Sequence, residues 1–134
     1  MWSCPECGRK FARNRQSHSC IQYNLDTQFQ GKEPITRELF DILVDNCKKL
    51  GEIEVYPGKY YITLRRLSTF VSVMAEKNHL TITFLSGRPV EEFPVYQNYQ
   101  YSSHRWANLL KVESAEELDN QLFCWLKEAY EIAI

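Results

Sequence analysis

The feature that most constrains this chain is a group of four metal-ligand residues near its start. Cys4, Cys7, His18 and Cys20 follow the pattern C-x2-C-x10-H-x-C. The short gap lets the thiolates of Cys4 and Cys7 both turn inward, and Gly8 can adopt the positive φ that such a turn often needs. Three thiolates and one imidazole favour zinc over calcium or magnesium. Because the protein fills all four positions, we expect one structural Zn2+ rather than a catalytic metal with a reactive water.

Two other chemistries of paired cysteines fit this segment less well. A disulfide requires an oxidising compartment, and we expect no secretory signal ahead of Cys4. A thioredoxin-type CxxC lies between a strand and a helix, and we expect no strand before Cys4. The gap between Cys7 and His18 is also shorter than the roughly twelve residues of a C2H2 finger. We therefore do not expect a complete recognition helix.

The charge of the chain is nearly balanced but unevenly distributed. Its 134 residues include 16 Lys or Arg and 17 Asp or Glu, so the protein as a whole is not a polycation. Residues 1–20 nevertheless carry a net charge of +3, from Arg9, Lys10, Arg13 and Arg15 against Glu6. No apolar run approaches the roughly eighteen residues that cross a bilayer. We expect a soluble, cytoplasmic protein with no membrane partner.

Beyond the cysteine segment, the hydrophobic pattern predicts a single α+β domain. We place a zinc finger at residues 1–22 and the α+β domain at 23–134, with a connector at 23–33. Apolar residues at helical spacing predict a helix over 36–50, which Thr36 can cap, and Ser114 opens a second helix. Between them, alternating residues predict an antiparallel sheet of about five strands, the last at 101–112 after an irregular loop at 86–100. Both main helices should pack on one face of that sheet.

Several separated segments of the chain resemble one known family. They are WSCPECGRKFARNRQSHSC, LDTQFQGKEP, LFDILV, VYPGKYYITLRR and HRWANLLKVESAEELDNQL. In this order they resemble the domain of unknown function 5655 family, a bacterial and archaeal family of uncharacterised proteins. The resemblance covers nearly the whole chain. It implies a Cys3His zinc finger in front of a small α+β domain and carries no established activity.

Basic residues interleaved with aromatic ones in the domain indicate where a ligand would bind. Cations suit phosphate and aromatic faces suit bases, which is the pairing that single-stranded nucleic acid or a nucleotide requires. Equally, tyrosines are common in strands, and Lys and Arg mark the solvent face of a half-buried sheet. The candidate ligand-binding residues are Lys59, Arg65, Arg88, His104 and Arg105 in the domain and Arg9, Lys10, Arg13 and Arg15 in the finger.

Catalysis has little support in the sequence. His18 is assigned to the metal and His79 to a turn, which leaves His104 as the general-base candidate. We place His104 at the rim of the core on the last strand, where it is either part of a ligand site or a structural hydrogen-bond donor. No paired carboxylates, nucleophile elbow or glycine-rich phosphate loop is present. We therefore expect a non-catalytic zinc-finger protein that binds nucleic acid or a nucleotide. The alternative is a protein-interaction adaptor, and the sequence indicates no oligomeric state.

Overall fold

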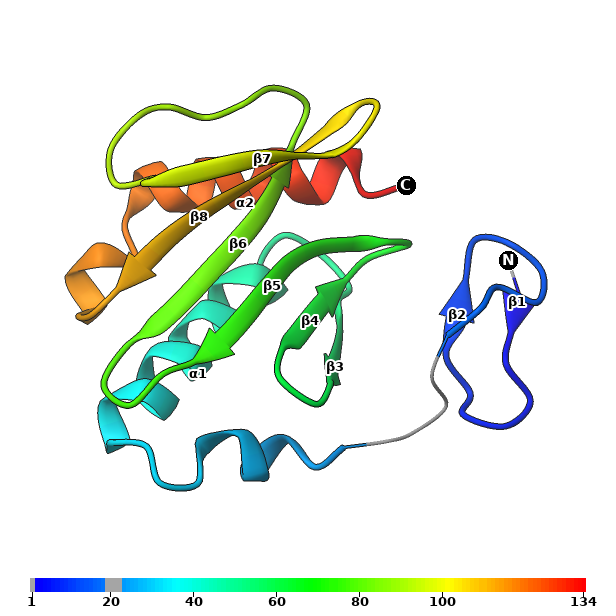
Figure 1. Cartoon of the computed structure of the whole chain (residues 1–134), viewed down its shortest axis with the longest axis horizontal. Helices are drawn as coiled ribbons and strands as arrows, with labels where there is room; N and C mark the ends of the chain where they lie inside the picture. Colours follow the sequence, from blue (N-terminus) through cyan, green and yellow to red (C-terminus); the bar gives the residue numbers. More distant parts are fainter. Residues whose placement is uncertain (1, 19–22) are drawn as a thin grey trace.

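The structure is a computed structural model that describes residues 2–18 and 23–134. Residues 2–18 form a small unit, here named the knuckle, in which β1 (Trp2–Ser3) pairs antiparallel with β2 (Lys10–Phe11). Residues 23–134, here named the body, contain two α-helices and a six-stranded sheet, and the knuckle lies beside that sheet (Figure 1). The predicted α+β class is confirmed.

The large sheet is antiparallel throughout and has the strand order β3-β4-β5-β6-β8-β7. Residues in β6 alternate without exception between buried and half-buried, so one face of the sheet is apolar and the other is more polar. The connection from β6 to β7 spans residues 87–96 and lets β8 pair between these two strands. The strands are β3 (Glu54–Pro57), β4 (Ile62–Arg65), β5 (Thr69–Ala75), β6 (Leu80–Ser86), β7 (Gln97–Ser102) and β8 (Arg105–Val112).

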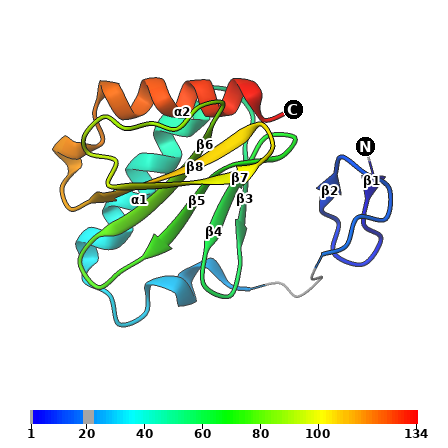
Figure 2. The ribbon, with the colours of Figure 1, turned by 45° about the horizontal axis from the view of Figure 1, so that its top comes forward.

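Both α-helices lie on the same face of the sheet, as predicted (Figure 2). The helices α1 (Pro34–Lys48) and α2 (Asn120–Ile132) each bury one stripe of side chains against the sheet. Trp125 of α2, for example, stacks on Phe84 of β6 with ring centroids 5.3 Å apart. Two short 3-10 helices, η1 (Leu25–Phe29) and η2 (Ala115–Glu117), precede α1 and α2. No helix within the described ranges is long and apolar enough to cross a bilayer.

The sheet has six strands rather than about five because the end of the predicted loop is itself a strand. β7 and β8 form a hairpin that turns at Ser103 and His104, where we predicted one continuous strand over 101–112. β7 is an edge strand, and all of its residues are exposed except the half-buried Asn98. It therefore lacks the alternation of buried side chains from which strands are recognised in a sequence.

Both helices begin at residues other than those predicted. α1 starts earlier, with a proline in its first turn. Thr36 therefore does not cap it, and the buried Thr36 hydroxyl instead donates to the Glu76 carbonyl at 2.9 Å. α2 starts after Asp119, whose carboxylate accepts from the Leu122 N–H at 3.0 Å. Ser114, predicted to open this helix, precedes η2.

A buried polar network holds the 87–96 segment on the sheet. Asn108 of β8 is fully buried, and its Nδ2 donates to the Ser86 hydroxyl at 2.8 Å and to the Phe84 carbonyl at 3.2 Å. Its Oδ1 accepts from the Val90 N–H at 2.9 Å. Asn98 of β7 donates to the Val90 carbonyl at 2.9 Å. Part of the segment predicted as an irregular loop is therefore anchored to the core.

Candidate metal centre and adjoining cleft

The turn that carries the first two cysteines is closed by backbone hydrogen bonds. The Cys4 N–H donates to the Arg9 carbonyl and the Gly8 N–H donates to the Cys4 carbonyl, each at 2.8 Å. Gly8 has a φ of 75°, a conformation that glycine adopts without a steric penalty. β1 does precede Cys4, contrary to our expectation, but it pairs with β2. The described residues 8–18 that follow Cys7 form no helix. The arrangement therefore still differs from a thioredoxin-type CxxC.

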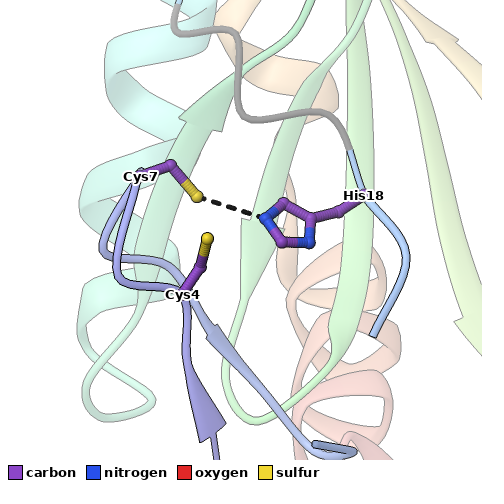
Figure 3. Close-up of side chains that lie close together, drawn as sticks. All are labelled: Cys4, Cys7 and His18. Carbon is purple, nitrogen blue, oxygen red and sulfur yellow. Dashed lines mark hydrogen bonds between the residues drawn. The ribbon is translucent and has the colours of Figure 1, made fainter. Parts of the chain in front are cut away.

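His18 brings an imidazole to the same place from the other end of the knuckle. Its Nδ1 lies 2.7 Å from the Gln16 carbonyl oxygen, which can only accept, so Nδ1 carries the ring proton and donates it. Nε2 then directs its lone pair toward the thiols and lies 3.3 Å from Cys7 Sγ (Figure 3). The His18 ring packs on the Phe11 ring, with centroids 4.2 Å apart. A hydrogen bond that orients one nitrogen so that the other can bind is typical of metal-ligating histidines.

The spacing of these donor atoms fits a metal ion. The ligand atoms of Cys4, Cys7 and His18 all lie within 4.8 Å of one another. In a tetrahedral zinc site, bonds of about 2.3 Å to sulfur and about 2.0 Å to nitrogen place the two ligand atoms about 3.6 Å apart. The observed Cys7–His18 separation is close to that value, so these three residues could hold a metal. Cys20, the predicted fourth ligand, lies outside the described residues.

The knuckle contacts the body through cations that lie over aromatic rings. The guanidinium of Arg65, the last residue of β4, lies 5.2 Å from the Phe11 ring centroid and 5.8 Å from that of Tyr56. Its Nη1 donates to the Lys10 carbonyl at 3.0 Å. Arg9 of the knuckle lies 5.3 Å from the centroid of the same Tyr56 ring. Arg65 and Tyr56 thus orient the knuckle against one end of the sheet.

Tyr56 of β3 also belongs to this contact, although the sequence analysis did not single it out. Its hydroxyl donates to the Glu54 carboxylate. Burial, assisted by that carboxylate, raises the pKa of Tyr56 to about 12. The phenol therefore stays neutral at physiological pH and offers its ring to two arginines. No sequence spacing could have indicated this, because the contact joins segments that meet only in the folded chain.

A cleft of about 620 Å³, here named the knuckle cleft, lies between the knuckle and the body. Four of the predicted ligand-binding residues line it, from three separate parts of the chain: Arg9 of the knuckle, Arg65 of β4, and His104 and Arg105 of the β7–β8 hairpin. Among the described residues that line the cleft there is no Asp or Glu. The structure therefore brings three arginines and one histidine together at one cleft. Hydroxyl groups at its wall come from Ser17, Thr63, Ser68, Thr69, Tyr101 and Ser102.

The placement predicted for His104 at the rim of the core is wrong. His104 is an exposed residue of the hairpin turn, because the single strand on which we placed it is two strands. Arg105 begins β8, and its Nη2 donates to the Ile132 carbonyl at 3.0 Å. Part of its charge thus offsets the negative C-terminal end of α2. Of the two residues, His104 presents its side chain more openly to a ligand.

The other predicted basic residues lie outside the knuckle cleft. Lys59 lies 5.4 Å from the Tyr60 ring centroid in the turn after β3. Arg88 forms a salt bridge of 3.6 Å with Glu92 in the 87–96 segment. Of the four basic candidates in the knuckle, three do not line the cleft, namely Lys10, Arg13 and Arg15. The nine candidates therefore do not form a single surface.

Comparison with known proteins identifies the family of the body. A search of curated proteins and a search of solved structures found no match. The family model described as Domain of unknown function (DUF5655) matches residues 25–133, from η1 to just beyond α2. The matched range leaves out the ligand cluster of the knuckle. Because it covers most of the sequence, this chain belongs to the DUF5655 family.

Proposed function

We propose that the knuckle holds one structural zinc ion through Cys4, Cys7, His18 and Cys20. The geometry of the first three ligands supports this, and so does the Gln16 hydrogen bond that orients His18. Cys20 follows His18 by two positions and would supply the fourth donor of a closed Cys3His site. A reducing compartment such as the cytoplasm keeps such thiols available to a metal.

Metal analysis of the purified protein tests the zinc site. We expect one zinc per chain, with loss of zinc in Cys7→Ser and in Cys20→Ser. The matched control is Cys124→Ser, which changes an exposed cysteine of α2 and should keep its zinc. Zinc-free wild-type protein would rule out the site. Full zinc occupancy in Cys20→Ser would show that another residue is the fourth ligand.

The protein is, in this proposal, a non-catalytic module that binds single-stranded nucleic acid or a nucleotide, with phosphate in the knuckle cleft. The supporting observation is the convergence of Arg9, Arg65 and the His104–Arg105 pair on one cleft without carboxylate side chains among its described lining residues. The chain carries a net charge of only −1, so this local excess of cations does not follow from a basic composition. Guanidinium groups bind phosphate through strong, charge-assisted hydrogen bonds, and a histidine ring N–H can donate to a phosphate oxygen as well.

Arg65 keeps donors for a phosphate after it has docked the knuckle. Its Nη1 donates to the Lys10 carbonyl and its Nη2 donates to the Leu67 carbonyl. Each of these terminal nitrogens carries a second N–H. The planar guanidinium matches the geometry of phosphate oxygens better than an ammonium group does. Arg65 can therefore hold the knuckle and contact a ligand at the same time.

An oligonucleotide-binding assay tests this role. The affinity for a labelled single strand is measured by fluorescence anisotropy over a range of salt concentrations. Arg9→Gln should weaken binding and reduce the slope of log K against log salt by about 0.7, the value for one lost phosphate contact. The control Arg88→Gln makes the same change at an exposed arginine outside the cleft and should keep both affinity and slope. His104→Ala should weaken binding without lowering the melting temperature, because the side chain is exposed.

Two results would contradict the nucleic-acid role. The first is a wild-type protein that retains no oligonucleotide at low salt. The second is an equal loss of affinity in Arg9→Gln and Arg88→Gln, because total charge rather than the position of the arginine would then govern binding.

A protein-interaction adaptor is the second candidate, and one exposed aromatic residue favours it. Phe93, in the 87–96 segment, is 88% exposed, and exposed aromatics often anchor protein interfaces. An apolar interface depends little on salt, unlike phosphate binding. A partner retained from native lysate at high salt, and lost in Phe93→Ala, would favour the adaptor over nucleic-acid binding.

A further inference from the structure

The face of the sheet opposite the helices carries a second concavity. In Figure 1 both helices lie behind the sheet, so neither covers this side. A groove of about 520 Å³, here named the sheet groove, crosses the central strands and has Thr63, Ser72 and Thr83 among its lining residues. Tyr61, which precedes β4, and Tyr99 of β7 also line the groove, and these two strands lie toward opposite edges of the sheet. Its volume lies within the usual range for small-ligand sites.

The sheet groove differs from the knuckle cleft in charge. None of the described residues that line the groove is charged. Its lining combines hydroxyl groups with apolar side chains such as those of Met74 and Leu109. A phosphate would meet no cation there, whereas an uncharged ring would find both apolar contacts and hydrogen-bonding partners. The groove therefore suits a neutral, ring-bearing group.

The groove and the cleft are parts of one continuous surface. Four residues line both of them, namely Thr63, Thr69, Leu85 and Tyr101. The surface is positively charged at the end next to the knuckle and uncharged over the middle of the sheet. A ligand that fills both parts carries an anionic group at one end and a neutral ring close to it.

We propose that the sheet groove binds nucleobases of the same single strand whose phosphate occupies the knuckle cleft. This inference rests on the proposed function. Each nucleotide joins a phosphate to an uncharged planar base, which is the distribution of charge that the surface matches. Tyr61, Tyr99 and Tyr101 are 50%, 48% and 57% exposed, so their rings are accessible for stacking. Threonine and serine hydroxyls both donate and accept hydrogen bonds, so the groove should tolerate all four bases. A protein partner could cover the same face, but the adjoining arginine cleft favours a nucleic acid.

Two oligonucleotides of equal length and phosphate number, one normal and one abasic, separate base binding from phosphate binding. The wild-type protein should bind the normal strand at least about fivefold more tightly, the lower end of the effect of one stacked base. Tyr99→Ala, which changes a ring that lines the groove and not the cleft, should remove most of this preference and leave the affinity for the abasic strand unchanged. The control Tyr96→Ala changes an exposed tyrosine outside the groove and should keep the preference. Tyr61→Ala, which removes an exposed ring from the opposite end of the groove, provides a second variant and should weaken the preference as well.

The results distinguish this inference from the proposed function. Equal affinity of the wild type for both strands, together with the loss in Arg9→Gln, would overturn the base site and leave phosphate binding intact. Failure to bind either strand would overturn both. A preference for the normal strand that survives unchanged in both Tyr99→Ala and Tyr61→Ala would also overturn the base site.

Discussion

Removal of the metal is expected to unfold the knuckle. Among residues 2–18 only Cys4 and Phe11 are buried, each with 5% exposure. Burial of two such side chains contributes about 3–6 kcal/mol, whereas ordering a segment of this length costs on the order of 20 kcal/mol of conformational entropy. A structural zinc ion contributes about 10–16 kcal/mol. The folded knuckle is therefore strongly unfavourable without zinc, and zinc binding would supply the free energy that it lacks.

The body should stay folded when the knuckle unfolds. Its core lies between the helices and the sheet, and no described residue of the knuckle belongs to it. The knuckle contacts that would be lost include the cation–π pairs of Arg9 and Arg65, each of about 0.5–1 kcal/mol at exposed sites. The free energy of unfolding of the body should therefore fall by only about 1–3 kcal/mol.

Amide hydrogen exchange measures the two parts of the chain separately. Chelation should remove protection at the amides of Cys4 and Gly8, which donate to knuckle carbonyls. The amides of β6, in the middle of the sheet, should keep theirs. Cys7→Ser should show the same pattern without a chelator. Retained protection of the knuckle in zinc-free protein, or a single cooperative loss across the whole chain, would refute this reasoning.

Buried polar and thiol groups of the body lead to further predictions. Asn108→Leu leaves the buried Val90 N–H without its acceptor, so the free energy of unfolding measured in urea should fall by about 2–4 kcal/mol. A loss below about 1 kcal/mol would contradict the role of this hydrogen-bond network. Thr36→Val removes the hydroxyl that donates to the Glu76 carbonyl in the β5–β6 turn, so the free energy of unfolding should fall by about 1–2 kcal/mol in the same assay. An unchanged stability would contradict this role of Thr36. Burial raises the pKa of Cys47 to about 12, so a thiol reagent at neutral pH should modify Cys124 in the native body and reach Cys47 only after unfolding. The Cys47 thiol has a pKa near 9 in the unfolded chain and about 12 in the folded protein. Between these two pH values, Cys47 should therefore lower the free energy of unfolding by about 1.4 kcal/mol per pH unit. Cys47→Ala should lack this slope.

The clustering of the candidate metal ligands was predictable because their geometry is local. Cys4, Cys7 and His18 lie in one short segment, so their spacing alone indicates that the side chains converge. The helices were predictable for a similar reason, since each buries one stripe at helical spacing. The first residue of each helix was harder to predict, because Thr36 and Ser114 are both residue types that often cap helices. The Thr36 hydroxyl is instead used in a tertiary hydrogen bond, and Asp119 rather than Ser114 caps α2.

The strand β7 and the knuckle cleft could not be predicted in the same way. β7 lies at the edge of the sheet, so the sequence shows no buried alternation there and the hairpin turn at His104 went unrecognised. Arg65 and Arg105 stood out as basic residues near aromatic ones, and Arg9 stood out as a basic residue of the predicted finger. Their convergence depends on the docking of the knuckle on Tyr56, a contact between segments that no spacing encodes.

The dependence of oligonucleotide affinity on zinc is the most direct test of the account, because the knuckle forms one wall of the cleft. Affinity for a single-stranded oligonucleotide is measured on one preparation when zinc-loaded, after chelation and dialysis, and after reloading, with the zinc content determined each time. We expect affinity to fall on zinc removal at least as far as in Arg9→Gln and to return on reloading. Unchanged affinity in protein shown to be free of zinc would contradict the account, since the binding site would then not require the knuckle.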